Sequence, residues 1–174
     1  MKNWFMLSLV GKDQPSIVAN LSAGLCKNGC NLGESSMSRL GNYFTIMLMV
    51  EHDGGKNSLQ NIISSVSEPL GLDSHLVELE DGKQQHFEPD VRISLFAEDR
   101  IGVVEDATGP LANAGLNILH LESNLGEDGK TGTYYIHLEG TLSEGLASIY
   151  PVLEKLEEEK GIKSHLIPIN AQVS

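Results

Sequence analysis

The segment GKDQPSIVANLSAGLCKNGCNL, residues 11–32, returns in the second half of the chain as AEDRIGVVEDATGPLANAGLNI, residues 97–118. The two segments align without a gap, so that each residue of the first matches the residue 86 positions later. The apolar pattern repeats together with five identities, at Asp13/Asp99, Val18/Val104, Leu25/Leu111, Gly29/Gly115 and Asn31/Asn117. Solenoid repeats recur every ~20–50 residues, whereas this spacing is close to half of the 174-residue chain. The sequence therefore predicts two tandem domains.

The boundaries of the two domains follow from composition. Residues 81–89, DGKQQHFEP, are polar and contain a glycine and a proline, which is typical of a connecting segment. We therefore expect a first domain over residues 1–80, a linker over 81–89 and a second domain over 90–170.

Hydrophobic periodicity predicts the order βαββαβ in each half. In the first half we expect strands at 3–10, 32–40, 43–50 and 74–79, with helices from 17 to Gly29 and from 59 to Gly71. In the second half we expect strands at 91–96, from 117, at 133–138 and at 163–169, with helices at 101–114 and 144–160. Pro110 and Pro151 fall inside the last two helices and remove a backbone donor, so we expect kinks or short helices there.

This order favours an α+β fold made of two tandem ferredoxin-like domains, each an antiparallel sheet with both helices on one face. The second face of the first sheet is apolar as well, because Trp4, Met6, Met47 and Met49 alternate with other apolar residues. A solvated face would alternate with polar residues. We therefore expect protein to cover this face, either the sister domain or a second copy in a homodimer.

Composition excludes several classes of function. The formal net charge of −12 opposes a phosphate backbone, so we expect no direct nucleic-acid binding. No apolar run reaches the ~18 residues of a membrane span, and the first residues lack the features of a cleavable signal, so we expect a cytoplasmic protein without a membrane partner. Cys26 and Cys30 are the only cysteines, and a structural metal site needs more ligands than this pair.

Catalytic motifs are missing from the sequence. The glycine-rich residues 126–133, GEDGKTGT, lack the P-loop spacing and precede a strand, so we interpret them as a hairpin turn. The six histidines show no metal-ligand spacing, and no nucleophile motif is present. We expect no catalytic residue, no metal and no cofactor, and hence a protein that is not an enzyme.

The repeated loops KDQPS and EDRIG allow two interpretations. Asp13 and Asp99 stand where a carboxylate can accept the N–H of Ser16 or Gly102 and cap the following helix. Alternatively, the free N–H groups of the helix attract an anion while the carboxylate attracts a cation, which suits a zwitterionic amino acid. Asn31 and Asn117 are open to two interpretations in the same way, a local turn hydrogen bond or a ligand contact.

These features resemble the ACT domain, an amino-acid-sensing regulatory module. The resemblance is carried by the βαββαβ order, by DQPSIV and DRIGVV after the first strand, and by GCNL and GLNI at the second. It implies effector binding at an interface between ACT domains, by Asp13, Gln14, Pro15, Ser16, Ile17 and Asn31, and by Asp99, Arg100, Ile101, Gly102, Val103 and Asn117. Neither loop keeps the full D-R-P-G pattern, because Ser16 replaces the glycine in the first and Ile101 the proline in the second.

The run from Gly29 to Val50 is also similar to the family of glycine cleavage system transcriptional repressors, which consist of two ACT domains. That resemblance implies a non-catalytic regulator that binds a small amino acid, with glycine or serine favoured. It also implies indirect control of glycine cleavage genes through a DNA-binding transcriptional activator protein. The alternative is a structural assembly module that takes no small ligand.

Overall fold

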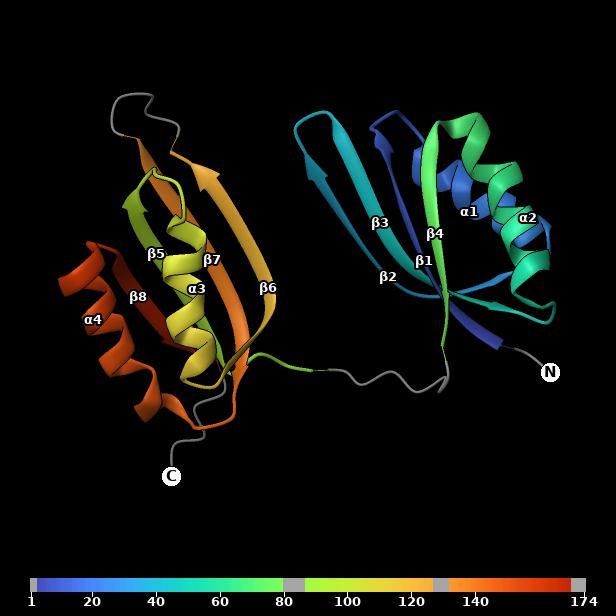
Figure 1. Cartoon of the computed structure of the whole chain (residues 1–174). Coiled ribbons are helices and arrows are strands. Elements are labelled where there is room, and N and C mark those ends of the chain that lie inside the picture. The colour runs from blue at the N-terminus through green and yellow to red at the C-terminus, as the bar shows by residue number, and fades with distance from the viewer. Residues whose placement is uncertain (1–2, 80–86, 127–131, 170–174) are drawn as a thin grey trace. The chain divides into compact units, whose positions relative to one another are not determined.

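The computed structural model describes residues 3–79, 87–126 and 132–169. The chain divides into two compact units, the first unit from Met1 to Gln84 and the second unit from Gln85 to Ser174 (Figure 1). Most of the segment expected to be a linker, and most of the expected turn at 126–133, lies outside the described residues. No helix in the described ranges is long and apolar enough to cross a membrane.

Each unit has the predicted βαββαβ order, with short 3₁₀ turns added. The first unit contains β1 (Asn3–Lys12), α1 (Ile17–Lys27), β2 (Asn31–Leu40), β3 (Tyr43–His52), α2 (Lys56–Ser67), η1 (Glu68–Leu70) and β4 (Leu72–Glu78). The second unit contains β5 (Val91–Glu98), α3 (Val103–Asn113), β6 (Leu116–Leu125), β7 (Thr133–Leu142), η2 (Leu146–Ser148), α4 (Tyr150–Lys160) and β8 (Lys163–Pro168).

The sheets have equivalent antiparallel topologies, β2-β3-β1-β4 in the first unit and β6-β7-β5-β8 in the second. The first and third strands of each unit are central, as their apolar sequences predict. An irregularity in the β2–β3 register between Leu32 and Ser35 has a counterpart between Ile118 and His120 in the β6–β7 register. The α+β, tandem ferredoxin-like class is thus confirmed.

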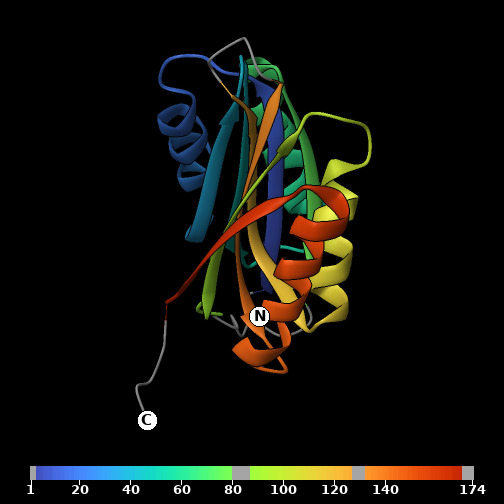
Figure 2. The ribbon, with the colours of Figure 1, turned by 90° about the vertical axis from the view of Figure 1, so that its left-hand side faces the viewer.

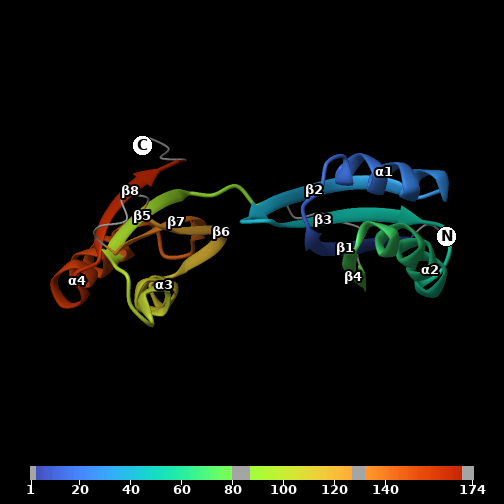
Figure 3. The ribbon, with the colours of Figure 1, turned by 90° about the horizontal axis from the view of Figure 1, so that it is seen from above.

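Both helices of a unit cover the same face of its sheet, as Figure 3 shows for α3 and α4. Alternate residues of β1 point to this face, and Phe5, Leu7 and Leu9 are buried in one cluster with residues of α1 and α2. The second unit has its own cluster, in which Ile93 and Leu95 contact residues of α3 and α4. Each unit therefore has a separate hydrophobic core.

The expected helix at 144–160 is wrong in its first turns. Residues Leu146–Ser148 form a 3₁₀ turn, and α4 begins at Tyr150. Pro151 consequently lies in the first turn, where no intrahelical donor is needed, so it starts the helix instead of kinking it. Pro110 does lie inside α3, which ends three residues later at Asn113.

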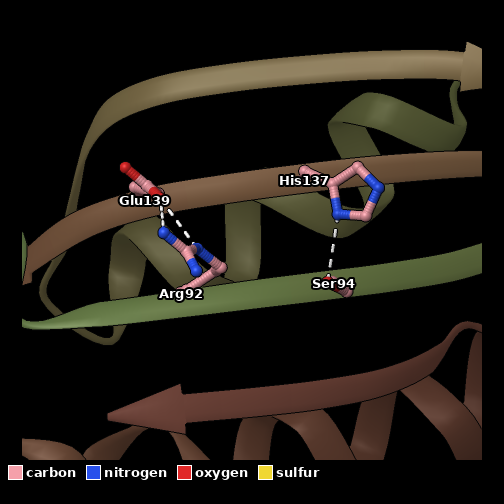
Figure 4. A network of polar contacts seen from close by, with 4 residues as sticks. All are labelled: Arg92, Ser94, His137 and Glu139. Carbon is pink, nitrogen blue, oxygen red and sulfur yellow. Dashed lines mark hydrogen bonds and ion pairs between the residues drawn. The ribbon is translucent and has the colours of Figure 1, made fainter. Parts of the chain in front are cut away.

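The sheet faces opposite the helices differ between the units. In the first unit Met49 is buried, Trp4 and Met6 are half-buried, and Met47 is 49% exposed. The expectation that the sister domain or a second copy covers this face stays a prediction. In the second unit the corresponding face carries two polar side-chain pairs (Figure 4) and, further along the same strands, an edge-to-face contact between Phe96 and Tyr135. Arg92 forms an ion pair of 2.6 Å with Glu139, and Ser94 Oγ lies 3.0 Å from His137 Nδ1.

Candidate functional site

The first loop, residues 13–16, joins β1 to α1 and is held by side-chain and backbone contacts. Asp13 donates its N–H to the Asn42 carbonyl at 2.9 Å, and its Oδ2 lies 2.9 Å from Arg39 Nε at the end of β2. Gln14 donates its side-chain amide to the Leu70 carbonyl at 2.6 Å. The loop thus presents a carboxylate and a guanidinium side by side.

The interpretation of the two aspartates as helix caps is wrong. The residues that precede α1 and α3, Ser16 and Gly102, make no side-chain cap, and the described residues show no hydrogen bond from their N–H groups to Asp13 or Asp99. Both residues have left-handed conformations, with φ of 62° and 86°. The chain therefore enters each helix through a tight turn, and the carboxylate of Asp13 contacts Arg39 instead.

The left-handed turn explains why glycine suits this position. Among the described residues Ser16 is the one non-glycine residue with positive φ, a conformation in which a Cβ is strained. We expect Ser16→Gly to raise the free energy of unfolding of the first unit by about 1 kcal/mol, and Gly102→Ser to lower that of the second unit by about 1 kcal/mol.

Denaturant unfolding of both variants measures this strain. A Cβ at residue 102 would meet no atom within 4 Å, so Gly102→Ser tests conformation without a clash. Changes of the same sign in the two variants would contradict the explanation.

The second loop, residues 99–102, has different contacts. Arg100 forms a 2.6 Å ion pair with Asp106 of α3, and Lys160 at the end of α4 reaches the other oxygen of Asp106 at 3.2 Å. Hydrogen bonds from Arg100 and Lys160 hold the pKa of Asp106 below its ordinary value. The Asp99 carboxylate has no partner in the described part of the chain, and Ile101 is fully exposed. Here the guanidinium is bound by a carboxylate of the following helix and not by the aspartate of its own loop.

The first turns of α1 and α3 differ in charge. That of α1 contains no acidic residue, whereas that of α3 contains Glu105 and Asp106. Because a helix N-terminus favours negative charge, the carboxylates of α3 already satisfy it and repel a further anion. The N-terminus of α1, next to Arg39, is the more favourable place for the carboxylate of a ligand.

The two asparagines do not join the loops within a unit. On β3, Tyr43 pairs with Lys12 and Glu51 pairs with Asn31, eight positions away. At about 3.3 Å per residue this places Asn31 roughly 26 Å along the sheet from the first loop. The same separation holds for Asn117 and the second loop. A small ligand can therefore contact only one of these two sets of residues within a unit.

Some of the predicted site residues belong to the hydrophobic core, and some of the charged residues at the loops were not predicted from the sequence. Ile17 and Val103 begin their helices with buried side chains, so a ligand has no access to these side chains. Arg39, Asp106 and Lys160 were not predicted. Comparison of the repeats favours residues present in both halves, whereas Leu125 stands 86 positions after Arg39.

The remaining polar clusters offer no metal centre. No group of three His, Cys, Asp or Glu residues in the described ranges is arranged to hold an ion. Cys26 is exposed, and Cys30 is buried with its Sγ 4.0 Å from His52 Nδ1. Burial, followed by the nearby Cys26 and Asp53, raises the pKa of the Cys30 thiol. Cys30 is therefore a neutral core thiol near neutral pH.

Comparison with known proteins identifies the fold family. Models of the ACT domain match residues 3–77 and residues 91–158, one in each unit. The chain belongs to the ACT-domain family. Its tandem ACT domains resemble, with a TM-score of 0.77 and 22% identity, the structure of an unknown protein from Galdieria sulphuraria, over 98% of this chain and 100% of that one.

Two further proteins are similar to this ACT-domain chain. The structure of a candidate glycine cleavage system transcriptional repressor has a TM-score of 0.73 and 15% identity, over 98% of this chain and 99% of that one. Uncharacterized protein MJ1458 of Methanocaldococcus jannaschii is 37% identical over 51 residues, which are 29% of this chain and 23% of that protein. The match thus spans about a quarter of the length of that relative.

Proposed function

We propose that this tandem ACT-domain protein is a non-catalytic cytoplasmic regulator that binds a small amino acid at its first loop. The observation that carries the proposal is the Asp13–Arg39 ion pair beside the N-terminus of α1. A zwitterionic amino acid has an ammonium for Asp13 and a carboxylate for Arg39 and the free N–H groups of the helix. The second loop offers no such pair, because Arg100 is bound to Asp106 of α3 and not to Asp99.

An amino acid can enter the first loop at low energetic cost. The side chains of Arg39 and Asp13 are 60% and 24% exposed, and ion pairs of this kind contribute only about 0–1 kcal/mol to stability. Separating the two groups for a ligand that contacts both therefore loses little. Glycine and serine are the ligands that we favour, because the chain resembles a candidate glycine cleavage system transcriptional repressor.

The regulated process that we propose is transcription of glycine cleavage genes. The structural similarity to a candidate repressor of that system supports this proposal. A net charge of −12 disfavours direct contact with DNA, so the protein would act through a DNA-binding activator protein. Ligand binding regulates that contact only if the partner-bound and partner-free states differ in affinity for the amino acid.

Calorimetry with glycine and serine tests the amino-acid site. We expect Asp13→Ala to weaken binding at least tenfold, because the ligand ammonium loses its charged partner. Asp99→Ala is the matched control in the second loop and is expected to bind as the wild type does. Asn31→Ala and Asn117→Ala report on the other end of each sheet. Circular dichroism checks that every variant is folded.

The other outcomes are equally decisive. Loss of binding in Asp99→Ala instead of Asp13→Ala would move the site to the second loop. Loss in an asparagine variant alone would move it to the start of β2 or β6. Wild-type binding in all four folded variants, or no binding at millimolar concentration, would reject an amino-acid site at these residues.

The alternative, an assembly module without a small ligand, is favoured by the apolar sheet face of the first unit. Met6, Met47 and Met49, together with Glu34, Ser35 and Ser36 of β2, line a shallow depression of about 220 Å³ on that face. A second copy that covers this face would form a homodimer. Light scattering that gives a dimer unaffected by any amino acid would support this alternative, and a monomer at tens of micromolar would reject it.

A further inference from the structure

A groove between the two helices of the second unit has not been assigned a role. Helices α3 and α4 lie side by side in Figures 1 and 2. Between them the surface encloses a volume of about 420 Å³, within the ~300–1,000 Å³ range of small-molecule sites. Pro110 and Asn113 of α3 line one side of the groove.

The repeats differ in the residue that faces the neighbouring helix at this point. In the first unit Gly24 brings α1 so near α2 that a Cβ there would lie 2.7 and 2.8 Å from the methyl carbons of Val66. Pro110 occupies the position of Gly24, 86 residues later. Its ring lines the groove on the α3 side, opposite Val152 and Leu156 of α4.

The groove combines an apolar floor with a cationic rim. Pro151, Val152 and Leu156 of α4 provide apolar surface opposite Pro110. The charged lining residues are Lys155, Lys160 and Glu159. The lining therefore carries one net positive charge in a chain whose formal charge is −12.

The two lysines differ in the ion pairs that hold them. Lys155 Nζ lies 3.7 Å from Glu159 in an exposed pair one helical turn apart, which contributes only a few tenths of a kcal/mol. Its ammonium is free to turn toward a ligand. Lys160 is held at 3.2 Å by Asp106, the same carboxylate that pairs with Arg100 of the second loop.

We infer that this groove is a second binding site, which takes a small carboxylate with an apolar tail. The tail packs on Val152, Leu156 and Pro110. The carboxylate binds the ammonium of Lys155 and also attracts the ammonium of Lys160. A ligand that withdraws Lys160 from Asp106 leaves that carboxylate to Arg100 alone, so the groove is connected to the second loop by ion pairs. The site does not depend on amino-acid binding at the first loop.

Amide NMR shifts of the full-length chain test the site with 3-phenylpropanoate as the probe and 3-phenylpropan-1-ol as its uncharged match. We expect saturable shifts at Asn113, Val152 and Leu156 with millimolar affinity. The alcohol is expected to bind about fivefold more weakly, because it makes no charge-assisted contact. Equal affinity of the two probes, or shifts without saturation in both units, would overturn the inference.

Two variants and a control separate the tail from the carboxylate. Val152→Trp fills the groove and is expected to abolish binding of both probes. Lys155→Gln is expected to weaken the carboxylate about fivefold and leave the alcohol unchanged. Lys56→Gln in the first unit makes the same change of charge and is expected to have no effect. Wild-type binding in folded Val152→Trp and in Lys155→Gln would refute the site, and equal weakening by Lys56→Gln would reduce it to a nonspecific charge effect.

Discussion

Leu95→Ala is expected to lower the free energy of unfolding of the second unit by about 2–5 kcal/mol and to leave the first unit unchanged. Leu95 lies on central strand β5 and is 1% exposed, in a core cluster of second-unit residues. Its truncation removes buried apolar surface and leaves a cavity that the surrounding side chains fill only in part. Since the first unit has a separate cluster, the loss stays within the second unit.

The single tryptophan makes this prediction measurable. Trp4 lies in β1, so its fluorescence reports unfolding of the first unit, whereas far-ultraviolet circular dichroism reports both units. Leu95→Ala should shift part of the dichroism transition and leave the fluorescence transition in place. Leu9→Ala, the equivalent change on β1 at a residue that is also 1% exposed, should shift the fluorescence transition together with the first unit's part of the dichroism transition. A shift of the fluorescence transition in Leu95→Ala would show one cooperative body instead of two.

Gly140→Ala is expected to destabilise the second unit by about 3 kcal/mol. Gly140 lies on β7 opposite Ile118, next to the register irregularity of β6. A Cβ at residue 140 would collide with the backbone carbonyl of Asn117 and lie 2.9 Å from Leu116 Cδ1. Backbone atoms cannot rotate away as a flexible side chain can, so the strands must separate.

Gly109→Ala is the matched control for this prediction. Gly109 lies inside α3, and a Cβ there would meet no atom within 4 Å. Alanine is the better helix former, so this variant is expected to gain about 0.5–1 kcal/mol. Denaturant unfolding of the two variants therefore gives opposite signs in the same unit. A stability of Gly140→Ala within 0.5 kcal/mol of wild type, on the roughly ±0.5 kcal/mol scale of neutral substitutions, would contradict the proposed close contact.

The candidate site was predicted from the sequence only in its local parts. The repeated aspartates are in loops after the first strand of each unit, where the sequence placed them. The residues that complete the ion pairs lie far along the chain: Arg39 is 26 residues after Asp13, and Lys160 is 54 residues after Asp106 of α3. Neither partner recurs in the other repeat, so the alignment of the halves gave no signal for it.

The asparagines show the limit of a motif that is read along the chain. Asn31 follows Asp13 by 18 positions, which is close in sequence. The helix between them runs back along the sheet, so the two residues end on opposite ends of the unit. Only the strand register reveals this separation.

The sequence by itself determined the duplication, the βαββαβ order and the residues of the two cores. These features depend on periodicity and on local turn chemistry, which act over a few neighbouring residues. The tertiary structure decided which ion pairs each loop makes, and it placed Pro110 of α3 opposite Val152 and Leu156 of α4 in one groove. Such features depend on contacts between residues distant in the chain, and a single change of side-chain volume or charge in one repeat alters them while the repeated pattern remains.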